Sequence, residues 1–181
     1  ERGLLGSAHY VKSPLFPLEQ TVAMFNLDMI GRMEKSTLTV YGTGTSSFWN
    51  HRVDEAGKAA GLTLIQKPEG FGPSDHASFY AKKIPVLHVF GGMHTDYHRP
   101  SDHWDKLNYA NMAATDVAVA FGVMNLASAA APPERRICPD VPATVTFTAL
   151  VPLPIRLWYA QYCVNAQLEP MQLPMPFAVN M

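Results

Sequence analysis

Apolar and polar positions alternate along the first 130 residues in a way that predicts short strands separated by helices. Short runs rich in β-branched and aromatic residues predict buried strands at 22–27, 38–41, 62–66 and 85–90. Apolar residues at helical spacing predict helices at 4–11, 46–60, 75–82 and 109–130. Gly61 is expected to end the second helix, and Ser74 or Asp75 is expected to cap the third.

The order of these elements predicts the fold class. Strands that alternate with helices are typical of an α/β fold, here a doubly wound, mostly parallel sheet flanked by helices. In such a sheet, ligands bind beyond the carboxyl ends of the strands, where the loops converge. The polar segments that directly follow predicted strands are therefore the first places to look for chemistry.

Composition changes sharply near residue 131. All 12 glycines precede it, whereas nine of the 15 prolines follow it. We therefore divide the chain into a domain at 1–131 and a Pro-rich extension at 132–181, where the prolines exclude a long helix or a central strand. The preferred hypothesis for the extension is a misread or truncated reading frame, and the alternative is a genuine, poorly ordered tail.

Charge and hydropathy exclude some function classes. A net charge of −1 without a basic cluster argues against a nucleic-acid partner. No uninterrupted run of 18 apolar residues is present, so no membrane span is predicted. The chain opens with Glu1 rather than Met, so any targeting segment is expected upstream and the compartment is not readable.

Three polar segments carry candidate chemistry. Glu1 precedes a glycine-containing turn, Asp28 ends the strand at 22–27, and His98 lies in a polar loop after the strand at 85–90. Two carboxylates and an imidazole form a donor set that suits zinc, or less often manganese or cobalt. Each residue alone also has a structural explanation, because Glu1 fits a helix first turn and Asp28 fits a turn.

The other histidines have simpler interpretations. His9, His51 and His103 are expected at the surface. His88 lies inside an apolar strand and is expected to be a hydrogen-bonded core residue, and His94 is a loop residue without an assigned role.

Four segments taken together resemble the bacterial zinc aminopeptidases with two co-catalytic metals, a family related to glutaminyl cyclases and glutamate carboxypeptidases. They are Glu-Arg-Gly-Leu-Leu-Gly-Ser at 1–7, Asn-Leu-Asp-Met-Ile-Gly at 26–31, Ser-Asp-His-Ala-Ser-Phe at 74–79 and Tyr-His-Arg-Pro-Ser-Asp at 97–102. The resemblance extends to about residue 130 and implies the zinc exopeptidase fold of that family. It also implies a peptide substrate, and two zinc ions in an intact catalytic domain.

The resemblance assigns roles to individual residues. Glu1 and His98 are expected to bind one zinc ion and Asp28 the other, while Tyr97 is expected to donate a hydrogen bond to the oxyanion formed during hydrolysis. The alternative for Tyr97 is an aromatic residue that packs beside the metal loop. Asp75 or Asp102 is expected to orient the metal-binding histidine.

Part of the family pattern is not found in this sequence. Family members also carry an earlier His-x-Asp pair and a general-base glutamate directly before the position of Glu1. We expect these three residues upstream, so that the chain supplies three of five ligands and is inactive by itself. Because relatives are commonly exported, a secreted or periplasmic parent protein is favoured.

Two other functions remain open. Glutaminyl cyclases share the scaffold but tend to carry Trp at the position of Tyr97, so this residue favours the peptidase. A non-catalytic binding relative would have little physical reason to retain Glu1, Asp28 and His98 together, which argues against that alternative.

Overall fold

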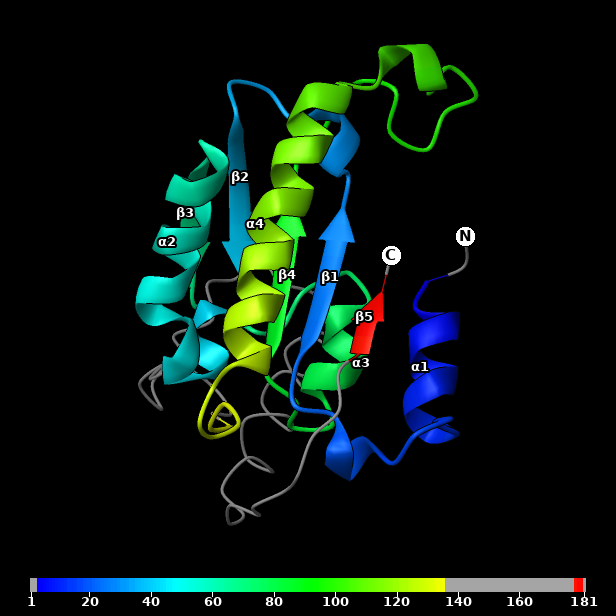
Figure 1. The fold of residues 1–181 in the computed structure, drawn as a ribbon. Coiled ribbons are helices and arrows are strands. Elements are labelled where there is room, and N and C mark those ends of the chain that lie inside the picture. The colour runs from blue at the N-terminus through cyan, green and yellow to red at the C-terminus, as the bar shows by residue number, and fades with distance from the viewer. Residues whose placement is uncertain (1–2, 136–177, 181) are drawn as a thin grey trace, which may run out of the picture.

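The computed structural model describes residues 3–135 and 178–180, which form an α/β fold around one mixed sheet (Figure 1). The strands follow the order β3-β2-β4-β1-β5 across the sheet. Neighbouring strands are parallel except β2 and β4, which are antiparallel. The bounds are β1 (Met24–Asp28), β2 (Thr37–Tyr41), β3 (Thr63–Lys67), β4 (Val86–Phe90) and β5 (Ala178–Asn180). The predicted α/β class with a mostly parallel sheet is confirmed.

Four α-helices among the described residues accompany the sheet: α1 (Leu5–Lys12), α2 (Asn50–Ala60), α3 (His76–Tyr80) and α4 (Tyr109–Ala127). The short 3₁₀ helices are η1 (Leu18–Gln20), η2 (Ile30–Arg32), η3 (Thr43–Thr45), η4 (Ser47–Trp49) and η5 (Trp104–Lys106). The helix predicted at 46–60 is therefore η4 followed by α2, and Gly61 ends it with φ 68° as expected. The predicted cap of α3 is wrong, because no side chain caps that helix.

Alternation along the central strands separates two hydrophobic layers. Met24 and Val86 pack with Phe79 of α3 on one face of the sheet. The next residues, Phe25 and Leu87, belong to the cluster on the other face, which includes the buried side chains Trp49, Val53 and Leu126. Because side chains on a strand alternate between faces, the sheet has α1 and α3 on one side and α2 and α4 on the other (Figure 1).

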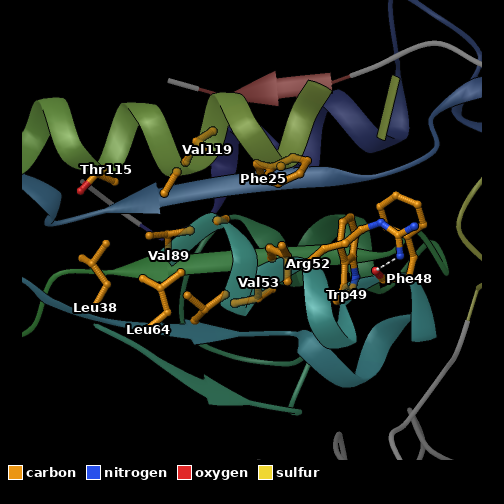
Figure 2. A pocket seen from close by; sticks show the side chains of 15 residues that line it. Phe25, Leu38, Phe48, Trp49, Arg52, Val53, Leu64, Val89, Thr115 and Val119 are labelled. Atoms are coloured by element: carbon orange, nitrogen blue, oxygen red, sulfur yellow. Dashed lines mark hydrogen bonds between the residues drawn. The ribbon is translucent and has the colours of Figure 1, made fainter. Parts of the chain in front are cut away.

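A small apolar cavity of about 40 Å³ lies on the side of α2 and α4 (Figure 2). Phe25 and Val89 of the sheet, Val53 of α2 and Gly122 of α4 contribute to its wall. Binding sites for small molecules combine apolar walls with a few converging polar groups. This wall is almost wholly apolar, so we interpret the cavity as a packing gap of the core.

Helix α4 is, among the described residues, the single helix long and apolar enough to cross a membrane by length and composition. In the structure its inner residues Thr115, Ala118 and Leu126 are buried, and the helix packs beside α2. Only 17% of this stretch is buried within the described structure, so its burial does not settle the matter and the absence of a membrane span stays a prediction.

The extension predicted at 132–181 lies mostly outside the described residues. Only 132–135 and the strand β5 are described there, and β5 pairs with β1 at the edge of the sheet. The two hypotheses about this part of the chain therefore both stay open.

Candidate metal centre at the carboxyl ends of β1 and β4

Polar side chains gather on the α3 face of the two central strands. Asn26 and Asp28 have the same parity along β1 as Met24, and His88 has the same parity along β4 as Val86. Asn26 and His88 are also direct neighbours in the parallel register. Strand alternation and register together therefore place these three polar residues on the face that α3 covers.

Hydrogen bonds connect this face to the residues that precede α3. Asn26 Nδ2 donates to Ser74 Oγ over 2.7 Å, and Ser74 Oγ donates to Asp28 Oδ2 over 2.9 Å. Asn26 Nδ2 also lies 3.3 Å from His76 Nδ1. Since an amide nitrogen only donates, His76 Nδ1 is the acceptor and its ring proton is on Nε2. The relay orients the Asp28 carboxylate through Oδ2.

His76 and His88 form a buried stack beside Asp28. Their ring centroids are 4.3 Å apart, and both side chains are buried. Burial, followed by repulsion from His88, lowers the pKa of His76 to about 3. Burial also lowers the pKa of His88, although nearby Asp28 opposes that effect. Both rings are therefore neutral near pH 7.

The predicted core position of His88 is confirmed, but its hydrogen bonding differs from the expectation. His88 Nε2 lies 3.7 Å from Asp28 Oδ2, which is too long for a hydrogen bond. Within residues 3–135, neither His88 Nε2 nor His76 Nε2 has a hydrogen-bond partner.

Tyr97 and His98 lie in the long loop between β4 and α4. This loop extends from the end of the sheet at which β1 and β4 finish (Figure 1). The Tyr97 ring stacks on the His98 ring with centroids 3.9 Å apart. Tyr97 is 41% exposed and His98 is also exposed, so both side chains are accessible to a substrate or an ion.

Two residues of the predicted site region have left-handed backbone conformations. His98 has φ 54°, and Met29, directly after Asp28, has φ 56°. For a residue with a side chain this conformation costs roughly 1–2 kcal/mol. Lys35, Ser36 and Lys83 share it, so it does not by itself mark a functional site. It does show that surrounding contacts must hold the backbone at both positions.

An ion-pair network joins η2 to the loop. Arg32 donates to Asp102 Oδ1 over 2.6 Å and to Asp96 Oδ2 over 2.8 Å. Hydrogen bonds from Ser101, then Arg32 and Lys106, hold the pKa of Asp96 well below its usual value. Asp102 thus binds Arg32 and lies 3.9 Å from His94. Its expected role as the acceptor for a metal-binding histidine has no support in these contacts.

The structure covers only part of the predicted ligand set. Glu1 lies outside the described residues, whereas Asp28 and His98 are described. In the part of the chain that is described, no three His, Cys, Asp or Glu side chains are grouped closely enough to hold a metal ion. The convergence of Glu1, Asp28 and His98 therefore stays a prediction.

The chemistry of the described donors nevertheless fits zinc. Asp28 is 38% exposed and its Oδ2 is held by Ser74, while no described side chain bonds Oδ1. His98 offers an exposed imidazole. Carboxylate oxygen and imidazole nitrogen are ordinary zinc ligands.

Sequence reasoning missed three residues that organise this region. Ser74 was predicted as a helix cap and as part of a motif, His76 only as part of that motif, and neither was expected to bond the strand; no role was predicted for Arg32. The polar residues at alternate positions of the strand, Asn26 and Asp28, were a usable indication, because they interrupt the apolar face of a buried strand. The Arg32 network had no such indication, since its partners are 64 and 70 residues away.

Solved structures place this fold among the aminopeptidases. The Legionella pneumophila LapA aminopeptidase superposes with a TM-score of 0.56 at 22% identity, over 70% of this chain and 36% of LapA. BSAP, a zinc aminopeptidase from Bacillus subtilis, superposes with a TM-score of 0.57 at 27% identity, over 68% of this chain and 32% of BSAP. The aminopeptidase from Aneurinibacillus sp. strain AM-1 superposes with a TM-score of 0.50 at 30% identity, over 76% of this chain and 33% of that enzyme.

Residues 1–122 match the model of peptidase family M28, and the chain belongs to this family. No curated protein sequence matches the chain. The chain spans about a third of the length of the solved aminopeptidases.

Proposed function

We propose that this chain is part of the catalytic domain of a zinc-dependent aminopeptidase that removes N-terminal residues from peptides. The family match over residues 1–122 supports a peptidase, and the solved zinc aminopeptidase BSAP supports the metal. Because the chain spans about a third of such enzymes, the base and the other ligands would come from the rest of the parent polypeptide, the gene product that contains this chain.

The geometry of Asp28 carries the proposal. Its carboxylate lies at the carboxyl end of β1, is partly exposed and is anchored through Oδ2 by Ser74. An oriented carboxylate with one oxygen that no described side chain bonds fits a metal ligand better than it fits a turn residue. Glu1 and His98 would complete the ligands of this chain, with two zinc ions in the intact domain. Bound zinc would acidify a water molecule and polarise the scissile carbonyl.

Tyr97 is the proposed hydrogen-bond donor to the oxygen that becomes negative during hydrolysis. Its side chain is exposed, and stacking on His98 restrains the direction of its ring. The stacking also fits the alternative packing role, so the two roles must be separated by experiment. Loss of a single oxyanion donor typically lowers kcat about 100- to 1000-fold.

The test uses the purified parent polypeptide with free and N-acetylated peptides. We expect release of N-terminal amino acids from free peptides only, and two bound zinc ions by elemental analysis. Asp28→Asn should lose zinc, because an amide oxygen is a poorer ligand than a carboxylate. Tyr97→Phe should keep its zinc and lose kcat by about 100-fold or more. A Tyr97→Phe enzyme with unchanged kcat would leave Tyr97 only the packing role.

The same preparation tests the two rival functions. Ammonia release and cyclisation of an N-terminal Gln peptide, without amino-acid release, would identify a glutaminyl cyclase. Less than one zinc per chain, not restored by added metal, would instead indicate a non-catalytic binding relative.

A further inference from the structure

Arg32 connects two segments that the proposed site requires. It ends η2, four residues after Asp28, and its guanidinium bonds two carboxylates of the loop that carries Tyr97 and His98. Nη1 lies 2.6 Å from Asp102 Oδ1 and Nη2 lies 2.8 Å from Asp96 Oδ2. These two aspartates flank Tyr97 and His98 in the sequence, so one side chain holds both sides of the segment.

The network inside the loop centres on Asp96. Its Oδ2 accepts from Arg32 and from Lys106 Nζ at 3.0 Å, and its Oδ1 accepts from Ser101 Oγ at 2.6 Å. The side chains of Arg32 and Asp96 are only 16% and 15% exposed. Isolated surface ion pairs contribute little to stability, but a shielded, forked arginine in a network is geometrically restrictive.

Backbone hydrogen bonds attach the two ends of the loop to β1 and η2, whereas those in its middle, such as Arg99 N to Asp96 O over 2.9 Å, stay within the loop. At one end Gly91 N donates to Asp28 O over 3.0 Å, and at the other Asn108 N donates to Gly31 O over 2.8 Å. A Cβ on Gly91 would lie 2.1 Å from Met29 O, so the backbone at Gly91 packs very closely against the backbone that follows β1. Between these ends, the Arg32 side chain bonds the loop from η2.

We infer that Arg32 is a positioning residue that clamps the loop through Asp96 and Asp102 and so sets Tyr97 and His98 relative to Asp28. This inference rests on the proposed function for its catalytic consequence. The left-handed backbone of His98 supports it, because a conformation that is unfavourable locally needs external contacts to persist. The clamp itself is a property of the chain and does not depend on the metal.

The experiment compares Arg32→Met with the wild-type parent polypeptide. Hydrogen exchange of the amides at 94–103, measured without metal, should be at least about 10-fold faster in the variant, because exchange reports local opening. Zinc affinity should fall about 10- to 100-fold, as is typical when a residue that orients a ligand is lost. At saturating zinc, kcat should fall about 10-fold with KM nearly unchanged, since Tyr97 is proposed to act in the transition state.

Arg52→Met is the matched control. Arg52 is likewise a partly buried arginine with bonded neighbours, its guanidinium lying 4.0 Å from the Phe48 ring and donating to Phe48 O, but it lies on α2 rather than beside the loop. Its substitution should leave loop exchange, zinc affinity and kcat unchanged. Arg32→Lys retains the charge but not the fork, so its loop exchange and kcat should lie between those of the wild type and Arg32→Met.

Asp102→Asn is a second variant in case Arg32→Met does not fold. It keeps the shape of the side chain and removes one charged partner of Arg32. Loop exchange, zinc affinity and kcat should change in the same directions as in Arg32→Met, but by smaller amounts. Loop exchange equal to the wild type in Arg32→Met, or in Asp102→Asn, would overturn the clamp. So would Arg32→Lys behaving as wild type, because the fork would then be unnecessary.

The two proposals fail in different ways. A wild-type parent without zinc or peptidase activity would refute the proposed function, and the exchange measurement would still judge the clamp. An active wild type with normal zinc affinity and kcat in a folded Arg32→Met variant would refute the positioning role alone.

Discussion

Gly122 in α4 and Gly57 in α2 allow matched substitutions with opposite expected effects on stability. Gly122 lines the apolar cavity, and a Cβ there would lie 3.5 Å and 3.9 Å from two atoms of the Phe25 ring. Replacing glycine by alanine inside a helix gains about 1 kcal/mol. Partial burial of the added methyl group adds up to about 0.8 kcal/mol. Gly122→Ala should therefore raise the free energy of unfolding by about 1–1.5 kcal/mol.

Gly57→Ala gains the same helix propensity but meets occupied space. The added Cβ would lie 2.9 Å from Leu64 Cγ and 3.0 Å from the backbone oxygen of Leu62. Overpacking of this kind costs about 1–3 kcal/mol. The free energy of unfolding of Gly57→Ala should therefore be unchanged or lower by up to about 2 kcal/mol.

Urea denaturation of the parent polypeptide and both variants, followed by circular dichroism, measures the differences in the free energy of unfolding. Thermal denaturation of the same proteins gives their melting temperatures. The melting temperature of Gly122→Ala should rise by about 2–6 °C, depending on the size of the cooperative unit. Equal stabilisation by both alanines would show that helix propensity alone decides the outcome. That result would refute the reasoning from the cavity and from the contacts of Gly57.

Two further substitutions test the polar relay below Asp28. Ser74→Ala should weaken zinc binding about 10-fold and lower the free energy of unfolding by about 1–3 kcal/mol, because Asn26 loses a buried partner. Zinc competition measures the first effect and denaturation the second. Unchanged zinc affinity would contradict the role of the relay. Since the folded pKa of His76 is about 3 and its ordinary value 6.5, the unfolded state binds the proton first as the pH falls below 6.5. Stability should therefore decrease by about 2 kcal/mol from this residue between pH 6.5 and 5, in the same direction as the effect of His88. Metal-free His76→Gln should show a shallower decrease over that range, and an unaltered slope would contradict the assignment.

Secondary structure could be predicted from the sequence because each element is locally self-consistent. The apolar run that became β1 and the Gly61 stop of α2 depend on neighbours within a few residues. The antiparallel pairing of β2 with β4 could not be predicted in this way, since it depends on which strand edges are free after folding. The alternation of strands with helices predicted that a site would lie beyond the carboxyl ends of the strands. It did not predict which side chains bond one another at the candidate site.

The candidate site shows the same division. Asp28 and His98 were identified from motifs that are contiguous in sequence; Asp28 is the last residue of β1, and His98 lies in the loop that follows β4. Ser74 was assigned a local role as a helix cap, whereas its hydroxyl bonds Asp28 across 46 residues. Long-range hydrogen bonds of this kind follow from the fold and leave no local pattern to detect.

The central place of β4 has a consequence for synthesis on the ribosome. β1 and β2 are adjacent in the chain but not in the sheet, because β4 separates them. Until Val86–Phe90 leaves the exit tunnel, β1 has no partner strand among 3–135 and the pair of β2 and β3 has an open edge. Unpaired edges favour association between chains. A nascent chain that stalls before β4 has left the tunnel should therefore depend strongly on chaperones, whereas one that stalls once β4 is outside can already hold the four strands β1 to β4 together.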